Sequence, residues 1–130
     1  MMTSVPGVFA AGNVVTVFDL VDYVSQTGEM AARGAVRYLK GELETGSCRA
    51  VEAGDNIRFV VPQKISGTAG EVPVFMRVRK PDEKVRLVFS QDKQSQLKKH
   101  AVVKPPEMVC EVIDLGKTTD GPICISVAKE

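Results

Sequence analysis

The sequence lacks several features that would point to particular classes of protein. It has no tryptophan, 1 histidine and 5% aromatic residues, and no Gly-x-Gly occurs in its 130 residues. Its apolar runs fall short of the roughly 20 residues that cross a bilayer, so we expect no membrane segment. The net charge of +1 argues against a nucleic-acid binder driven by bulk electrostatics. The amino terminus also lacks the basic and long apolar regions of a signal peptide, which favours a cytoplasmic protein.

Thiol and imidazole groups are also scarce. Cys48, Cys110 and Cys124 are far apart and form no C-x-x-C. With only His100 available besides, no zinc-ligand spacing occurs, and we predict no metal site. Cys110 and Cys124 lie in apolar, strand-like runs and are expected to be small buried hydrophobes rather than a redox dithiol. His100 follows two lysines and is expected to be exposed, so the sequence predicts no catalytic residue.

The first forty residues carry the most information. The apolar run Val8–Ala11 ends at Gly12 and Asn13, and the stretch from Asp19 to Lys40 has helical spacing. This pattern predicts a buried strand, a glycine turn and a helix. A glycine at such a corner lets a bound group approach the backbone closely, because no Cβ intervenes.

The expected helix has recognisable ends and one face of small residues. Asp19 is the expected N-cap or first-turn acid, and Gly41 is the expected stop after the last turn. The face that recurs at steps of three and four consists of Val21, Val24, Gly28, Ala31, Ala32, Ala35 and Leu39. Because its side chains are small, we expect this face to accept a closely packed neighbour.

The residues before the helix also resemble a known motif. Thr3, Pro6-Gly7, Val8-Phe9-Ala10 and Gly12 together resemble the second flavin-binding motif of FAD-dependent pyridine nucleotide-disulfide oxidoreductases, a Thr, a spacer, Pro-Gly, then hydrophobic-Phe-Ala-x-Gly-Asp. In that family the Gly-Asp step lies beside the ribityl chain of FAD, and the Asp hydrogen-bonds a ribityl hydroxyl. The resemblance therefore implies Gly12 and Asn13 as cofactor-binding residues, with a neutral amide in place of the carboxylate.

The resemblance covers residues 3 to 41, and a weaker one extends to Lys98-Lys99-His100 and Lys104–Met108. It implies that the chain is the carboxyl-terminal portion of an FAD-dependent NAD(P)H oxidoreductase. A complete enzyme of the family grips FAD and NAD(P)H with Gly-x-Gly-x-x-Gly loops, which are absent here. We therefore expect the chain to supply part of a flavin pocket, to be inactive alone and not to bind FAD alone. Its implied partner is the rest of the flavoprotein or a partner subunit.

The second half of the chain reads as strands. Residues 1–46 carry 3 Lys and Arg against 5 Asp and Glu, whereas residues 47–130 carry 14 against 11, which places a boundary near Ser47. Residues 41 to 56 read as a linker. Period-two apolar runs predict five strands, at Ile57–Val61, Val72–Val78, Val85–Phe89, Met108–Ile113 and Ile123–Val127.

The predicted fold class is therefore α+β. Residues 1–46 form the end of an FAD-binding domain (strand, Gly-Asn turn and helix), and residues 47–130 form a small antiparallel β-sandwich, with an immunoglobulin-like arrangement as the expected one. An alternative function remains open, a free-standing β-sandwich interaction or dimerisation module that forms a homodimer.

One candidate surface lies in the second half. Arg58, Arg77, Arg79 and Arg86 fall on the polar phase of their strands. They make a basic stripe for an acidic partner if the strands are neighbours, and otherwise a solvated face that blunts edge pairing. The second interpretation is favoured.

Overall fold

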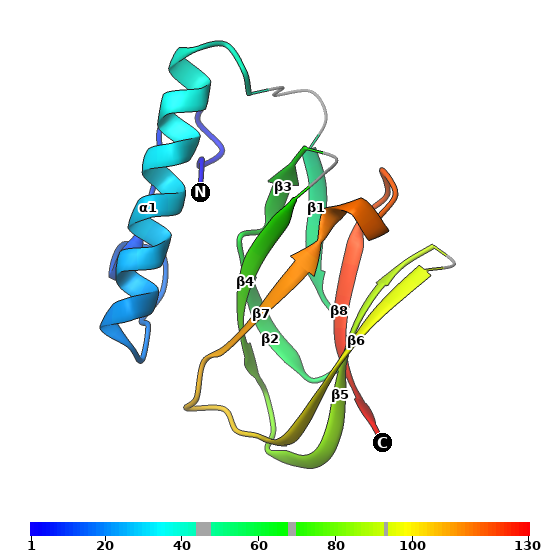
Figure 1. Ribbon diagram of the computed structural model, residues 1–130. Coiled ribbons are helices and arrows are strands. Elements are labelled where there is room, and N and C mark those ends of the chain that lie inside the picture. The colour runs from blue at the N-terminus through cyan, green and yellow to red at the C-terminus, as the bar shows by residue number, and fades with distance from the viewer. Residues whose placement is uncertain (44–47, 68–69, 93) are drawn as a thin grey trace. The chain divides into compact units, whose positions relative to one another are not determined.

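The computed structural model describes residues 1–43, 48–67, 70–92 and 94–130 (Figure 1). Over these ranges the protein is a mixed α+β chain, with one α-helix and two sheets of mainly antiparallel strands. The chain divides into two compact units, Met1–Thr45 and Gly46–Glu130, which are described separately. No helix in the described ranges has the length and apolar character needed to cross a membrane.

The first unit is built on helix α1, Val21–Leu39, as the spacing predicts. The N-cap is Leu20, in extended conformation and without a side-chain cap, so Asp19 precedes the cap and the expectation for it is wrong. Asp22 provides the acid of the first turn, where it interacts favourably with the helix dipole.

The predicted stop at Gly41 is confirmed. Gly41 has a φ of 71°, in the left-handed region. Its N–H donates to the carbonyl of Tyr38 at 3.0 Å, and the N–H of Glu42 donates to that of Arg37 at 2.9 Å. These two bonds form a Schellman motif, which satisfies the last carbonyls of the helix and ends it at this point.

Replacing Gly41 by alanine should therefore weaken the end of the helix by about 1 kcal/mol, because alanine is strained at positive φ. No atom lies within 4 Å of a Cβ added at Gly41, so crowding adds nothing. The measurement is amide exchange at Glu42, which we expect to rise about fivefold. The matched control is Gly28→Ala, also without a neighbour within 4 Å but inside the helix. Gly28→Ala should slow amide exchange within α1, because alanine favours the helical conformation. Unchanged exchange in Gly41→Ala would contradict the motif.

The segment before the helix differs from the prediction. Val8–Ala11 forms no strand, and its only bridge is the antiparallel one between Met2 and Phe9. The N–H of Thr3 donates to the carbonyl of Val8 at 2.8 Å, so the chain folds back on its own first residues. Val8 is 50% exposed. The prediction of a buried strand is wrong because a strand needs a paired neighbour, and the described residues offer this segment only the short stretch at Met1–Thr3.

The second unit contains eight strands in the described ranges. They are β1 Cys48–Ala53, β2 Ile57–Val61, β3 Lys64–Ser66, β4 Glu71–Val78, β5 Asp82–Gln91, β6 Gln94–Val103, β7 Val109–Asp114 and β8 Ile123–Lys129. The strands predicted from period-two runs are confirmed as β2, β4, β5, β7 and β8.

These strands form two sheets that share one core. One sheet has the order β3-β1-β8-β5-β6 and the other β2-β4-β7 (Figure 1). The pairing of β1 with β8 is parallel, and the other pairings are antiparallel. Core residues come from both sheets, among them Leu87 and Ile125 from the first and Met76 and Ile113 from the second. Burial of these alternate side chains holds the sheets face to face.

Three strands fall where the sequence predicts none, namely the short β3 and the longer β1 and β6. Residues 41 to 56 read as a linker, yet β1 pairs on both sides within that range, and Val51 enters the core. Strand β6 is predominantly polar, and β5 pairs with it from Asp82↔Val103 to Gln91↔Gln94. Neither β1 nor β6 has a strong apolar alternation of its own, and backbone hydrogen bonds to neighbouring strands stabilise both. The linker prediction is wrong for Cys48–Ala53.

A bulge also changes the phase of β2. The alternation predicts that Ile57, Phe59 and Val61 share one face. The register shifts between Ile57 and Phe59, and Val60 then pairs with Met76, with both side chains in the core. One extra residue in a bulge moves every later side chain to the opposite face, so the predicted face is wrong beyond Ile57.

Candidate functional site

The corner formed by Gly12 and Asn13 is the site that the sequence singles out. Gly12 begins a single 3-10 turn, Gly12–Val14, and has a φ of 63°. A Cβ added there would lie 3.1 Å from Cγ1 of Val24 on α1. Glycine is therefore required twice at this position, by the left-handed backbone and by the close approach of the helix. The space that the missing Cβ leaves faces Val24, whereas the sequence predicts that a bound group lies there.

A threonine that is not among the predicted site residues holds this corner. Thr27 is the only described residue of α1 that is buried, with 0% of its surface exposed. Its Oγ1 accepts the N–H of Gly12 at 3.0 Å and donates to the carbonyl of Val24 at 2.9 Å. The signal in the sequence is a threonine three residues after Val24 and four before Ala31, on a helical face that is otherwise apolar or small.

Asn13 is exposed and takes part in one described hydrogen bond. Its Oδ1 accepts the N–H of Phe18 at 3.2 Å and so closes the loop between these two residues. The described contacts leave both hydrogens of Nδ2 available to a ligand. An exposed amide donor on a fixed corner fits the hydroxyl oxygens of a ribityl chain.

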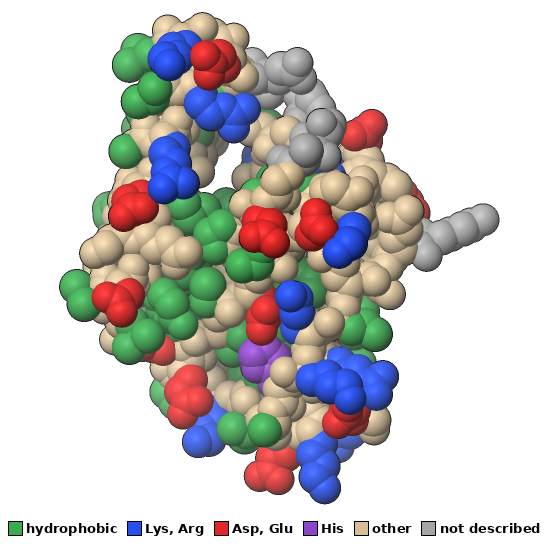
Figure 2. Space-filling view, in the orientation of Figure 1, with side chains coloured by type: hydrophobic (Ala, Val, Ile, Leu, Met, Phe, Trp, Pro, Cys, Tyr) green, Lys and Arg blue, Asp and Glu red, His purple; other side chains and the backbone are tan. Residues whose placement is uncertain are grey.

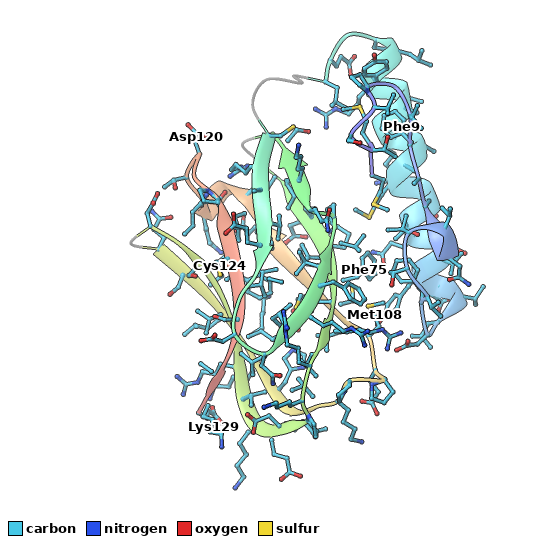
Figure 3. All side chains as sticks on the ribbon, turned by 180° about the vertical axis from the view of Figure 1, so that it is seen from behind. Phe9, Phe75, Met108, Asp120, Cys124 and Lys129 are labelled. Atoms are coloured by element: carbon cyan, nitrogen blue, oxygen red, sulfur yellow. The ribbon has the colours of Figure 1, made fainter. Side chains whose placement is uncertain are left out.

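Two aromatic rings pack around the small residues of the first unit. Cε1 of Phe9, labelled in Figure 3, would lie 2.8 Å from a Cβ added at Gly34 of α1. The ring of Tyr38 would lie 3.0 Å from a Cβ added at Gly7. The two rings meet edge to face, with centroids 6.3 Å apart. Gly34 and Gly7 thus leave room for the rings of Phe9 and Tyr38. The face of α1 that contacts the preceding segment centres on Thr27, Gly34 and Tyr38.

The first unit leaves much apolar surface exposed. Among the described residues, nine of the twelve exposed large hydrophobic side chains belong to it, namely Val5, Val8, Val14, Val15, Val17, Leu20, Val21, Val36 and Leu39. Hydrophobic side chains are visible at the surface around α1 in Figure 2. A unit of this size buries too little of its own apolar surface, and such exposure is typical of a surface that contacts another protein part.

The four arginines of the predicted basic stripe do not form one surface. Arg86 lies on β5, in the larger sheet. Arg58 lies on β2 and Arg77 on β4 in the other sheet, and Arg79 directly follows β4. Figure 2 shows acidic and basic side chains interspersed over the visible face.

The arginines also have local structural roles. The guanidinium of Arg77 donates to the carbonyls of Pro105 and Pro106, in the β6–β7 loop. Nε of Arg79 donates to the carbonyl of Ile57 at 3.0 Å. Arg86 lies 3.5 Å from the carboxylate of Glu130. The pKa of Glu130 is lowered by the hydrogen bond from Lys99 and by the charges of Lys99 and Arg86. These contacts give three of the arginines local structural roles rather than a place in one basic stripe.

His100 is half-buried and paired, whereas the sequence predicts an exposed residue. Its Nε2 lies 2.9 Å from Oε1 of Glu111 on β7, and Nζ of Lys98 lies 4.0 Å from the other carboxylate oxygen. This cluster links the edge strands β6 and β7 of the two sheets. The cluster thus joins the two sheets at this edge through side-chain contacts.

The cysteines are free thiols without redox partners in the described ranges. Cys48 is exposed, and Cys110 and Cys124 (Figure 3) are half-buried. Burial, with a smaller contribution from neighbouring carboxylates, raises the pKa of both half-buried thiols, so neither is activated as a thiolate. Nor do the described residues include a cluster of three metal-ligating side chains.

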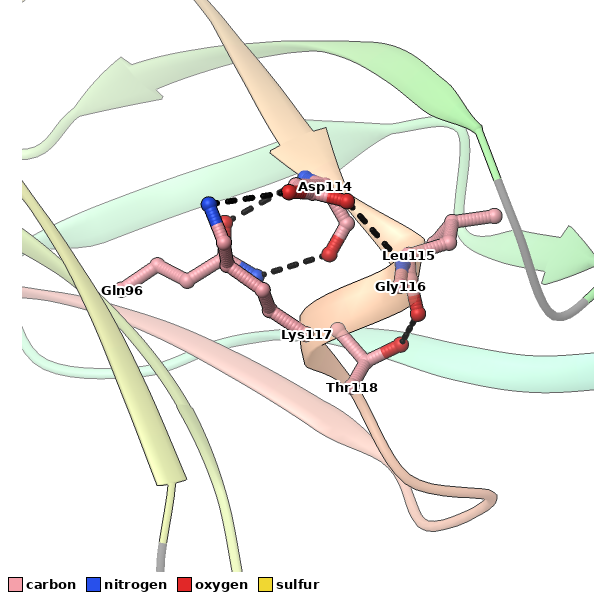
Figure 4. A network of polar contacts seen from close by, with 6 residues as sticks. All are labelled: Gln96, Asp114, Leu115, Gly116, Lys117 and Thr118. Atoms are coloured by element: carbon pink, nitrogen blue, oxygen red, sulfur yellow. Dashed lines mark hydrogen bonds and ion pairs between the residues drawn. The ribbon is translucent and has the colours of Figure 1, made fainter.

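A polar cluster fastens one end of the second unit (Figure 4). The side-chain amide of Gln96 donates to the carbonyl of Asp114 at 2.9 Å and accepts its N–H at 3.2 Å. The carboxylate of Asp114 accepts the N–H of Gly116 at 3.0 Å, and Nζ of Lys117 lies 3.0 Å from it. A shallow depression beside these groups is lined in part by Gln96, Lys117 and Thr118, whose side chains already bond to Asp114 or to the carbonyl of Leu115.

This cluster predicts a shift in titration. The hydrogen bond from Lys117, with smaller contributions from the Gly116 amide and the lysine charge, lowers the pKa of Asp114 below its usual 3.8. A lowered folded-state pKa stabilises the fold above the unfolded pKa, and this contribution is lost as the pH falls through the folded value. We expect Lys117→Ala to raise the Asp114 pKa toward 3.8 in an NMR titration of the carboxyl carbon.

The matched control is Lys104→Ala, which removes another lysine three residues from its acid, Glu107. It should leave the titration of Asp114 where it is. A Lys117→Ala curve that coincides with wild type would show that the lysine does not stabilise this carboxylate.

Two buried polar side chains hold the loop before β8. Arg49 of β1 is 5% exposed and donates to the carbonyls of Thr119, at 2.9 Å, and Gly67, and to the hydroxyl of Thr118. Gln91 of β5 is 4% exposed, accepts the N–H of Thr119 at 2.6 Å and donates to the carbonyls of Thr119 and Gly121. These contacts hold the loop before β8 in place.

Comparison of the chain with models of known protein families, with curated proteins and with solved structures found no match.

Proposed function

We propose that this chain is the carboxyl-terminal portion of an FAD-dependent pyridine nucleotide-disulfide oxidoreductase. The motif over Thr3 to Asn13 carries the proposal, because its residue types and spacing resemble the second flavin-binding motif of that family. The local geometry supports it, since Gly12 is fixed at a corner and the adjacent Asn13 is exposed with a free donor group.

In this proposal Asn13 binds a ribityl hydroxyl of FAD through Nδ2, while its Oδ1 keeps the bond to the N–H of Phe18. When bound, FAD supplies the redox chemistry, and NAD(P)H is the proposed electron donor. The corner itself orients the cofactor and moves no proton. The described first unit presents one such contact, so the grip on the pyrophosphate belongs to the remainder of the flavoprotein.

The exposed apolar residues of the first unit support the same proposal. A remnant of a larger flavin-binding domain would lack the neighbours that cover Val14, Leu20 and Val21. The remainder of a cytoplasmic flavoprotein, or a partner subunit, is the proposed cover. The second unit is then an accessory β-sandwich, and we propose that its strands have an immunoglobulin-like arrangement.

The decisive experiment is to sequence the genomic reading frame upstream of Met1. A continuous frame that encodes a Gly-x-Gly-x-x-Gly strand-helix unit supports the flavoprotein. A frame that starts at Met1 would overturn it and favour the homodimeric interaction module. Titration of the isolated chain with FAD should give no saturable fluorescence change, because the corner alone leaves the pyrophosphate and adenosine in water. A micromolar dissociation constant would contradict this expectation.

The charge at residue 13 gives a second test in the intact flavoprotein. An aspartate there keeps an acceptor for the N–H of Phe18, and its other oxygen can accept the ribityl hydroxyl in place of the lost amide donor, so we expect Asn13→Asp to retain FAD. Reduction adds electron density to the flavin, and a nearby negative charge opposes it. The reduction potential should fall by on the order of 10–30 mV, because water screens part of the field. Spectroelectrochemical titration measures the potential, with Asp22→Asn on the helix as a control. An unchanged potential in Asn13→Asp would place the flavin elsewhere.

A further inference from the structure

Thr27 connects the helix to the corner through a single hydroxyl group. The Thr27 hydroxyl has one hydrogen, which it donates to the carbonyl of Val24 at 2.9 Å. The orientation of that hydrogen leaves a lone pair for the N–H of Gly12, at 3.0 Å. Because Thr27 is completely buried, water cannot replace either bond.

The corner has little freedom besides this bond. Gly12 is buried, its backbone is left-handed, and Val24 lies against it. The N–H of Val15 donates back to the carbonyl of Gly12 at 3.0 Å. The direction in which Asn13 leaves the turn therefore follows from where the helix holds Gly12.

We propose that Thr27 is the positioning residue of the Gly12–Asn13 corner, and that its hydroxyl sets the affinity of this corner for a polyhydroxylated ligand chain. The second part rests on the proposed flavin function, with the ribityl group of FAD as the ligand. Thr27 touches no ligand in this proposal and acts through the backbone amide of Gly12.

The test compares Thr27→Val, which keeps the shape of the side chain and removes the hydroxyl, with Thr27→Ser, which keeps the hydroxyl. In the 130-residue chain, we expect amide exchange at Gly12 to rise about tenfold in Thr27→Val and to stay within about twofold of wild type in Thr27→Ser. Thr16→Val is the matched control, because Thr16 lies in the neighbouring loop and makes none of the described side-chain bonds. Thr16→Val should leave the rate of amide exchange at Gly12 unchanged.

The same variants in the intact flavoprotein test the second part. The dissociation constant for FAD should rise about tenfold in Thr27→Val and recover in Thr27→Ser. Unchanged exchange at Gly12 in Thr27→Val would overturn the positioning role. Faster exchange with unaltered FAD affinity would overturn its role in ligand binding. If the intact wild-type protein binds no FAD, the proposed function fails, and the exchange result still decides whether Thr27 positions the corner.

One measurement needs no variant and so covers the case in which Thr27→Val does not fold. In the wild-type chain the buried hydroxyl proton of Thr27 should exchange slowly and show a nuclear Overhauser effect to the amide proton of Gly12. A Gly12 amide that exchanges at the rate of an unprotected peptide would overturn the inference.

Discussion

Gly12→Val should reduce the FAD content of the intact flavoprotein to less than about a tenth of the wild-type value. A β-branched residue at a φ of 63° is strained by roughly 1–3 kcal/mol. Its Cβ would also lie 3.1 Å from Val24 Cγ1, and the further methyl groups would push the corner away from α1. That movement breaks the bond from the Gly12 N–H to Thr27 and displaces Asn13.

The control for this result is Gly41→Val. Gly41 has a similar φ, 71°, but no atom lies within 4 Å of an added Cβ, and it stands after the last turn of the helix. It imposes the same backbone strain away from the corner, so FAD content should remain near that of wild type. The absorbance of released flavin per mole of protein gives the content. Normal flavin in Gly12→Val, with the protein folded, would mean that the motif resemblance has misplaced the cofactor.

Arg49→Met should destabilise the second unit by about 2–3 kcal/mol. Methionine fills most of the space but removes the charged donor to the carbonyls of Gly67 and Thr119, of which that of Thr119 keeps its bond from Gln91. A hydrogen bond from a charged group contributes about 1.5–3 kcal/mol. The lower cost of burying a neutral side chain offsets part of this loss. Urea unfolding, followed by the amide signals of the core strands, measures the change.

Arg58→Met is the matched control, since Arg58 lies exposed on β2. Its effect should stay within about 0.5 kcal/mol, as for other surface substitutions. An Arg49→Met protein as stable as the control would show that the loop before β8 does not depend on the buried guanidinium.

Most of the difference between expectation and structure comes from contacts that are distant in sequence. Strand β1 has a single strongly apolar residue directed into the core, Val51, and includes a buried arginine whose partners lie far along the chain. The Thr27–Gly12 bond spans fifteen residues and leaves no periodic trace. His100 reads as exposed among lysines, and only the meeting of β6 with β7 brings Glu111 to it.

The sequence by itself determined the elements whose signals are local. The helix Val21–Leu39 follows from 3.6-residue spacing, and its end at Gly41 follows from the left-handed conformation that glycine adopts without strain. The strands with strong period-two alternation follow likewise. Only the tertiary structure decided that β1 pairs with β3 and that β6 pairs with β5. It also decided the phase of β2 and the turning back of Val8–Ala11 on Met1–Thr3. The reason is that backbone hydrogen-bonding groups must find partners wherever the fold brings them, and a polar strand forms when its neighbours supply those partners.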